Sequence, residues 1–411
     1  MNGEQRNSTL KLTERLLSET YDADVKLGVI SAPRPEGERH LVLRCELTHK
    51  PNNAPRAVIV KCAQQHENDI QVGGFISSDM LLNEWASLKF LGDLDTETTF
   101  APNVICGDID SRLIVTEEIA NAESLVEPIL GEDSDKTEQS LISFARFLGK
   151  MHVTTAGKSQ DFERHLSNVR EPGPNYGEYR RLILANLKSV LDHLELSPTP
   201  SFHDEVEPVL DAMLNTGPFL SCVHGDPCPD NVLISGSGIR LIDFENAGFK
   251  HALIEGVYGR MMFPSCWCAN RIPDSCAASM ELAYRTDLIR ESPDAADDLH
   301  FHNGVVEASA YWLIMALGWY LKRVITSDPD WGISTVRQRI MARLGAFVDV
   351  SEHYEHLPPL SAFARSLFHK LGARSMAGRN SRAFAISGIP VRLNANSLGM
   401  CDGPCANHEE L

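Results

Sequence analysis

The stretch of residues 222–245 constrains the fold most, because it places polar side chains at the ends of short aliphatic strands. It runs Cys-Val-His-Gly-Asp-Pro-Cys-Pro-Asp-Asn-Val-Leu-Ile, continues through Ser-Gly-Ser-Gly, and ends in Ile-Arg-Leu-Ile-Asp-Phe-Glu. Aliphatic runs on either side of a Gly- and Ser-rich turn predict an antiparallel hairpin. A turn centred on Ser237 would pair Val232 with Ile242.

The same register brings two oxygen-bearing side chains together at one end of the hairpin. It sets Asn231 opposite Asp243, and octahedral Mg²⁺ takes such oxygen ligands when it bridges nucleotide phosphates. Asp226 lies in the loop just before the hairpin, where its carboxylate could accept the proton of an attacking hydroxyl. This arrangement predicts phosphoryl transfer, whereas a surface hairpin with polar turn residues is the alternative explanation.

The order His-Gly-Asp, four residues, Asn, an aliphatic strand and Ile-Asp-Phe resembles the catalytic loop and metal motif of the aminoglycoside phosphotransferase and choline kinase superfamily. The resemblance implies that Asp226 is the catalytic base and that Asn231 and Asp243 hold Mg²⁺. It also implies that His224 braces the loop through hydrogen bonds. Glu245 gives Asp-Phe-Glu, as in choline kinases, and is a candidate ligand of a second metal ion.

The resemblance extends from about residue 20 to 330 and is strongest at 222–248. It implies an α+β, protein-kinase-like bilobal fold, with a small β-rich N-lobe and a larger, mainly helical C-lobe. Residues 147–152 look like the helix end before the family's substrate-binding insert. Glu255 is a candidate replacement for the structural aspartate that the family carries after its metal motif.

A lysine and a glutamate in the first hundred residues stand where charge is unfavourable. Lys61 interrupts the apolar run 57–63, and a buried ammonium needs an anionic partner. Glu84 shares a helical stripe with Leu81 and Leu88. We therefore expect Lys61 and Glu84 to pair and to hold the α- and β-phosphates of a nucleotide, as such pairs do in kinases. The alternative is that Lys61 extends to the strand edge and Glu84 is solvated.

Three regions are expected along the chain. Residues 1–118 have the order of an ATP-binding, β-rich N-lobe, with strands over 40–47, 56–63, 104–107 and 112–117 and a helix over 79–94. Residues 119–372 form the C-lobe, in which a hairpin at 222–244 interrupts helices over 138–154, 177–194, 203–214, 277–290, 303–325, 334–347 and 361–371. Residues 373–411 lack periodicity and are expected to be a mobile tail or a peripheral strap.

The connection between the lobes is expected at 113–124, where an aliphatic strand ends in a polar segment. In a kinase this hinge binds adenine through its main chain, so Glu117 and Ile119 are the candidate residues. The loop at 31–39 should cover the phosphates, but it has one glycine instead of the Gly-x-Gly-x-x-Gly of protein kinases.

Composition excludes several classes of protein. A formal net charge of −18 argues against a partner with a phosphate backbone or an anionic membrane surface. The longest uncharged apolar run, 308–321, is shorter than the roughly 18–20 residues that span a bilayer and predicts a buried helix. The polar first residues lack the apolar core of a secretory signal. Ten cysteines, mostly within apolar segments, suit a reducing compartment, so we expect a cytoplasmic protein.

Further cysteine and aromatic patterns are open to a functional or a packing explanation. Cys266 and Cys268 have poor zinc spacing without nearby histidines, so we expect them to pack. Cys401, Cys405 and His408 would supply only three ligands, and no metal is expected there. The aromatic rings of one helix could cage a quaternary ammonium or pack in the core: Tyr311, Trp312, Trp319 and Tyr320.

Together these features predict a kinase that moves the γ-phosphate of ATP, with Mg²⁺, to a hydroxyl of a small molecule. Antibiotics, sugars, choline- or ethanolamine-type amino alcohols and homoserine-type metabolites remain possible acceptors, and the acidic composition slightly favours an amine-bearing one. A nucleotide-binding pseudokinase is the rival explanation, although a scaffold need not keep Lys61, Asp226, Asn231 and Asp243. A protein kinase is disfavoured by His-Gly-Asp and by the absence of Ala-Pro-Glu. The oligomeric state is left open.

Overall fold

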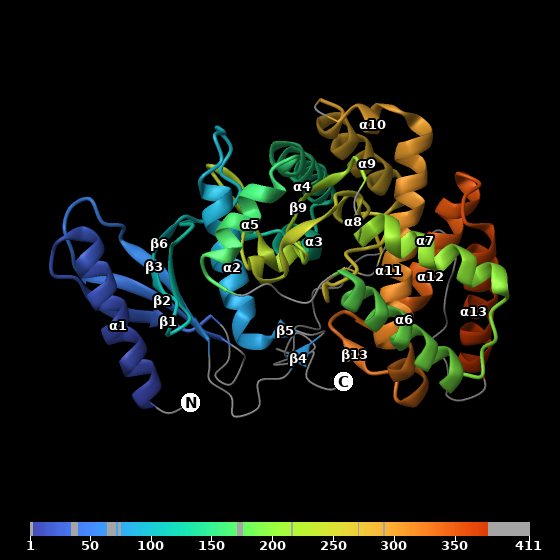
Figure 1. Ribbon diagram of the computed structural model, residues 1–411, viewed down its shortest axis with the longest axis horizontal. Helices are drawn as coiled ribbons and strands as arrows, with labels where there is room; N and C mark the ends of the chain where they lie inside the picture. Colours follow the sequence, from blue (N-terminus) through green and yellow to red (C-terminus); the bar gives the residue numbers. More distant parts are fainter. Residues whose placement is uncertain are drawn as a thin grey trace.

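The chain folds into a β-sheet region at the N-terminal end and a mainly helical remainder, as the sequence predicts (Figure 1). The computed structural model describes residues 3–33, 40–63, 71–72, 75–170, 176–214, 217–269, 271–290 and 292–376.

The N-lobe is built on a five-stranded antiparallel sheet of order β1-β2-β3-β7-β6. Its strands are β1 (Lys26–Ser31), β2 (His40–His49), β3 (Ala57–Ala63), β6 (Val104–Asp108) and β7 (Leu113–Glu117). A two-residue pair, β4 (Gln71–Val72) with β5 (Phe75–Ile76), precedes helix α2. The sequence did not predict β1, which pairs with β2 across a bulge.

Helices cover both faces of this sheet. Helix α1 (Gly3–Tyr21) lies on one face, closest to β6 and β1 (Figure 1), and its leucines share a hydrophobic cluster with Val58 and Val60 of β3. Helix α2 (Ser77–Gly92) packs on the other face and on the C-lobe. Because side chains alternate along a strand, Lys61 points away from α1 and toward α2.

The C-lobe surrounds the long helix α11 (Asp298–Thr326). Its other helices are α3 (Val126–Leu130), α4 (Ser134–Thr155), α5 (Ser159–Ser167), α6 (Tyr176–His193), α7 (Pro200–Leu214), α8 (Leu253–Gly256), α9 (Asp274–Leu288), α10 (Pro293–Ala296), α12 (Val336–His353) and α13 (Pro358–Met376). Helix α11 packs on α6, α7 and α12, and α4 packs along α9 (Figure 1).

Helix α11 confirms the buried helix predicted around residues 308–321. In the described part of the chain it is the one helix long and apolar enough to cross a membrane, and 72% of its apolar window is buried inside the protein. That burial is what a central core helix requires, because its apolar surface faces other helices on most sides.

Short strands shape the centre of the molecule. β9 (Leu220–Val223) pairs with β12 (Gly248–His251), and the hairpin β10 (Val232–Ser235) and β11 (Gly238–Leu241) lies between them in the chain. β10 also pairs with β8 (Glu123–Ser124), which follows the link between the lobes. A further two-stranded pair joins β13 (Asp330–Trp331) to β14 (Ser334–Thr335).

The predicted register of the central hairpin is wrong by one residue. Val232 pairs with Leu241, because a two-residue turn at Gly236 and Ser237 replaces the expected three-residue turn. The Ser235 hydroxyl closes this turn by accepting from the amide of Ser237 at 3.2 Å. Asn231 consequently lies opposite Ile242, and its carbonyl oxygen accepts a hydrogen bond from the amide of Ile242 at 3.0 Å.

Candidate active site

The loop between β9 and β10 carries the His-Gly-Asp motif in a conformation that needs glycine. Gly225 has a φ of +87°, and a Cβ at this position would collide with the carbonyl oxygen of Asn246. The motif thereby lies directly against the short 3₁₀ helix η2 (Phe244–Asn246) that follows Asp243. This contact needs a residue without a side chain at a left-handed φ.

His224 braces this loop with both ring nitrogens, as the sequence predicts. Nε2 donates to the carbonyl oxygen of Ile242 at 2.8 Å, since that oxygen can only accept. Nδ1 accepts from the backbone amide of Asp226 at 3.2 Å. These partners assign the neutral Nε2–H tautomer, and burial lowers the pKa of His224 in agreement with a neutral ring.

Lys61 forms the predicted ion pair with Glu84, with Nζ and Oε1 2.6 Å apart. The same ammonium lies 2.9 Å from Oδ1 of Asp243, a contact between residues 182 positions apart that the sequence analysis did not foresee. Burial alone would lower the pKa of Lys61, but the carboxylates of Asp243 and Glu84 outweigh it and raise the pKa. The lysine therefore stays charged and joins β3, α2 and the metal motif.

Asp243 owes its place to a left-handed backbone conformation. Its φ is +73°, at the point where the chain leaves β11 and enters η2. An aspartate tolerates this region better than most residues because its side chain is short. The turn directs the carboxylate to Lys61, so the residue lies beyond the hairpin instead of opposite Asn231 within it.

Asn231 offers an oxygen on the same side of the loop. Its Nδ2 donates to the backbone carbonyl of Asp226 at 3.0 Å, which leaves Oδ1 as the atom for a cation. Together with the carboxylate of Asp243 it makes the all-oxygen donor set that Mg²⁺ prefers. The residues present therefore fit the predicted metal.

Asp226 is a partly buried carboxylate whose Oδ1 is shielded from solvent. Burial, with smaller contributions from the charges of Asp230 and Asp243, raises its pKa to about 7 against an opposing effect of hydrogen bonds from Cys228 and Ser265. Among the described residues no group hydrogen-bonds its Oδ1. A buried acceptor without a donor is unfavourable unless a ligand supplies one, which suits a group that receives a substrate hydroxyl.

Glu245 lies on the N-lobe side of the metal motif. It is buried, and its Oε2 is 3.6 Å from Nδ1 of His40 on β2. Its role as a second metal ligand stays a prediction.

Helix α2 holds the metal motif through Asn83, a residue that the sequence analysis missed. Asn83 Nδ2 donates to the carbonyl oxygens of Glu245 at 3.1 Å and Ala247 at 2.9 Å. Its Oδ1 accepts from Arg170 at 3.2 Å. The available signal was a buried amide directly before Glu84 in an apolar helix, since such an amide must find partners.

A buried network supports the catalytic loop from below. Glu255 Oε1 accepts from the amide of Gly225 at 2.6 Å, and its Oε2 lies 3.0 Å from Nε2 of His152. Tyr284 completes the network at 2.8 Å from Nδ1 of the same histidine. Burial would raise the pKa of Glu255, but the bonds from His152 and Gly225 lower it and keep the carboxylate charged. Glu255 thus occupies the structural role that the sequence suggested.

The proposed hinge lies where the lobes join. The amide of Glu117 donates to Asn103, so only its carbonyl remains for a nucleotide. Its carboxylate accepts from Arg240 at 2.7 Å. Within the described ranges, Ile119 makes no backbone hydrogen bond, as an adenine-binding position would require. Most of the predicted phosphate loop, residues 34–39, lies outside the described residues.

The aromatic rings of α11 divide between core and site. Tyr311 is buried, and Trp312 donates Nε1–H to the carbonyl of Ile254 at 2.6 Å. Tyr320 packs on Trp331 with ring centroids 5.1 Å apart. The charge of Asp226 also contributes to the raised pKa of the Tyr320 hydroxyl, after burial.

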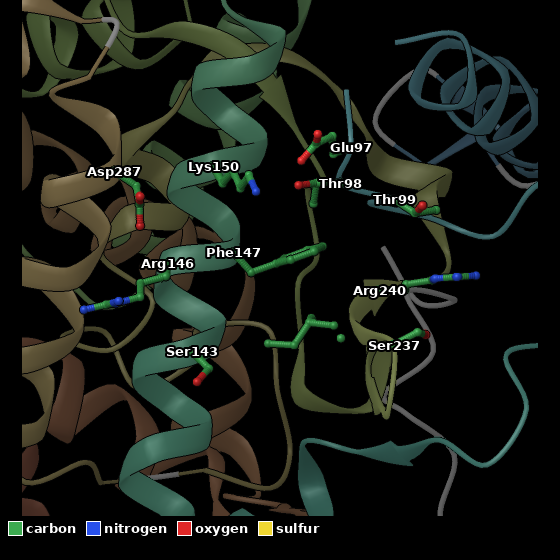
Figure 2. Close-up of a pocket in the computed structure, with 12 residues that line it drawn as sticks. Glu97, Thr98, Thr99, Ser143, Arg146, Phe147, Lys150, Ser237, Arg240 and Asp287 are labelled. Atoms are coloured by element: carbon green, nitrogen blue, oxygen red, sulfur yellow. The ribbon is translucent and has the colours of Figure 1, made fainter. Parts of the chain in front are cut away.

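A shallow cavity of about 370 Å³ lies apart from these residues. It is bounded by α4, the β10–β11 turn and residues 97–99, and Phe147 points from α4 toward the turn (Figure 2). None of the predicted site residues lines this cavity, so we do not place the reaction there.

Comparisons with known proteins agree with the geometry. Residues 81–276 match the model of the phosphotransferase enzyme family. The chain resembles the solved choline kinase of Cryptosporidium parvum Iowa II at 12% identity and a TM-score of 0.51, over 87% of this chain and 99% of that one. This likeness establishes the kinase-like bilobal fold.

Two other solved structures are similar with lower TM-scores. A choline/ethanolamine kinase family protein from Mesorhizobium loti is 16% identical, with a TM-score of 0.46 over 88% of this chain and 100% of that one. The GDP complex of wild-type aminoglycoside 2'-phosphotransferase-IIIa is 15% identical, with a TM-score of 0.46 over 84% and 99%. No curated protein matches the chain in sequence.

Proposed function

Since residues 81–276 match the model of the phosphotransferase enzyme family, we propose that the chain moves the γ-phosphate of ATP to a hydroxyl group of a small molecule. The observation that carries this proposal is the junction at Lys61, whose ammonium binds both Glu84 of α2 and Asp243 of the metal motif. Three distant segments meet there in the arrangement that phosphoryl transfer needs.

The residues divide the work in the following way. Asp226 receives the proton of the acceptor hydroxyl, and its raised pKa makes it a stronger base than an exposed aspartate. Lys61 binds the nucleotide phosphates and is oriented by Glu84. Asn231 and Asp243 hold Mg²⁺, which when bound neutralises charge on the phosphates. The main chain at Glu117 and Ile119 holds the adenine.

The acceptor is proposed to be a small molecule that carries an amine. Relatives are described as kinases of choline and of aminoglycosides, both of which bear cationic nitrogen. Tyr320 lies near enough to Asp226 for their charges to interact, and its ring could attract a cation, as aromatic faces do.

An ATP-consumption screen over hydroxylated amines, sugars and antibiotics, each with Mg²⁺, tests the proposal. We expect turnover with at least one amine-bearing alcohol, and the matched control is Asp226→Asn, which should reduce that turnover by roughly 10²–10⁴. Nucleotide binding without turnover on any acceptor would favour the pseudokinase. Equal turnover by the variant would reject Asp226 as the base.

A further inference from the structure

The catalytic loop brings its own cysteine and aspartate against a second cysteine-bearing segment. Sγ of Cys228, a carboxylate oxygen of Asp230 and Sγ of Cys266 all lie within 4.8 Å of one another. The first two belong to the loop between Asp226 and Asn231, and the third belongs to the segment after α8. In the sequence only Cys268 stands near Cys266, and the ligands from the catalytic loop have no local signal.

We propose that Cys228, Asp230 and Cys266 form a binding site for a thiophilic divalent cation, Zn²⁺ above all. Thiolate ligands select Zn²⁺ over Mg²⁺, and Zn²⁺ also accepts a carboxylate. Ligand atoms around tetrahedral zinc lie about 3.8 Å apart, given Zn–S bonds of about 2.3 Å. The observed separations can reach that value by small side-chain rotations.

Hydrogen bonds around the three groups resemble an outer shell of a metal site. Trp267 Nε1–H donates to Oδ2 of Asp230 at 3.3 Å, while Oδ1 is buried and has no hydrogen-bond partner among the described residues. The amide of Cys268 donates to Sγ of Cys266 at 3.3 Å. Such donors orient carboxylate and thiolate ligands in metal sites. Sγ of Cys268 lies 2.9 Å from Sγ of Cys266, beside the three ligands.

The buried charge beside the cluster also calls for a negative partner. Arg339 is 2% exposed and donates only to backbone carbonyls, including those of Cys266 at 2.6 Å and Ala269 at 2.7 Å. In the described part of the chain no carboxylate pairs with it. Carbonyl partners and the ring of Trp331, 4.8 Å away, satisfy its hydrogen bonds but leave its buried charge without an anion. Two thiolates and one carboxylate around a dication carry a net charge of −1, opposite in sign to Arg339 and to Arg343, the other buried arginine of α12.

The consequence is that the ion would fasten the catalytic loop to the segment around Cys266. Cys228 is two residues from Asp226, and its Sγ is already 3.2 Å from the hydroxyl of Ser265. The site does not depend on the proposed activity, because its ligands differ from Asn231 and Asp243. It would hold the loop by coordination, as structural zinc does in other folds.

The test measures metal content directly. The full chain, without a polyhistidine tag and kept reduced, is dialysed against ZnCl₂ and then against metal-free buffer. The zinc content per chain is then measured by inductively coupled plasma mass spectrometry. We expect a single ion per chain and, in Cys228→Ser and Asp230→Asn, an affinity for zinc weakened by at least the roughly 10–100-fold that losing an outer-shell partner costs. Matched controls are Cys276→Ser, another buried cysteine, and the double variant Cys401→Ser with Cys405→Ser, which removes the thiols of the C-terminal segment. Both controls should keep the ion.

Several results would overturn the site. They are retention of zinc by Cys228→Ser, loss of zinc in the Cys401 and Cys405 double variant, and no zinc on the parent protein. A disulfide between Cys266 and Cys268, located by peptide mass spectrometry in the metal-free chain purified without added reductant, would also do so, because it removes the Cys266 ligand. If Cys228→Ser fails to fold by circular dichroism, Asp230→Asn decides the question, since it keeps the shape of the side chain. Co²⁺ loading gives an independent readout, as thiolate ligands produce a charge-transfer absorption that Asp230→Asn should shift and Cys228→Ser should weaken.

Discussion

At the scale of single residues, the environment of Asp226 raises its pKa and thereby lowers the stability of the folded protein at neutral pH. Its pKa is about 7 in the folded protein against an ordinary 3.8, so between these values the folded state binds a proton that the unfolded state has released. The folded state is therefore favoured at low pH, and this contribution is lost between about pH 4 and pH 7. A general base near the working pH requires that loss.

Replacing Asp226 by Asn should accordingly stabilise the protein at pH 8. The neutral amide mimics the protonated acid, so we expect a gain of roughly 2–4 kcal/mol in unfolding free energy at pH 8 that shrinks toward zero near pH 4. Urea unfolding of both proteins across this range measures it. A gain that does not change with pH would show that the carboxylate is not the cause.

Asp243→Ala should weaken nucleotide binding, in contrast to Asp226→Asn. The change removes an anionic oxygen from the proposed Mg²⁺ site and one of the two partners of Lys61. Calorimetric titration with a non-hydrolysable ATP analogue and Mg²⁺ compares the two variants. Normal Mg-nucleotide binding by Asp243→Ala would place the metal elsewhere.

At the scale of elements, the packing of α2 against β3 and η2 positions the site. Lys61→Ala and Glu84→Ala should each reduce turnover, but the double variant should lose less than the sum, because the second change removes a partner that is already stranded. Kinetics of the three variants on the same acceptor give the coupling. Full additivity would mean that the 2.6 Å pair has no part in turnover.

The link from α2 to η2 can be tested separately through Asn83. Asn83→Leu removes the donor to two backbone carbonyls and leaves them buried, so we expect a loss of about 1–3 kcal/mol in unfolding free energy and weaker Mg-nucleotide binding. Ser87→Ala is the matched control, since that hydroxyl bonds only within α2, to the carbonyl of Asn83. If both changes affect nucleotide binding equally, the hydrogen bonds from Asn83 to η2 do not contribute to binding, and Asn83 serves only the stability of the helix.

At the scale of the whole molecule, a nucleotide should tie the two lobes together. The proposed ligands come from β3 and the hinge on one side and from the catalytic loop and η2 on the other. Mg-ATP at about 100 times its dissociation constant should add about 2.7 kcal/mol to the unfolding free energy.

Thermal melts with and without saturating Mg-ATP measure this stabilisation, with Asp243→Ala as the control that should respond less. The same melts are repeated with Mg-GTP, because the proposed main-chain contacts at the hinge do not predict whether adenine or guanine is preferred. Melts that shift with neither nucleotide would contradict nucleotide binding.

Local pattern was sufficient for much of this protein. The spacing from His224 to Asp243 predicted the loop, the hairpin and the donor set, because turn and strand signals act over a few residues. Lys61 and Glu84 could be paired in advance because each charge was unfavourable in its own apolar element. The spacing of apolar residues along the chain predicted a β-rich lobe followed by a helical one.

Contacts between distant segments had no local signature, and they complete the site. Three such contacts depend on how the helices and strands pack against one another. They are the ion pair of Lys61 with Asp243, the hydrogen bonds from the Asn83 amide to the metal motif, and the approach of Cys266 to Cys228. Even the hairpin register differed by one residue, since the Ser235 hydroxyl and the left-handed Gly238 favour a shorter turn than composition alone indicates. Side-chain patterns encode which face is buried, whereas the packing of those faces selects which polar groups meet.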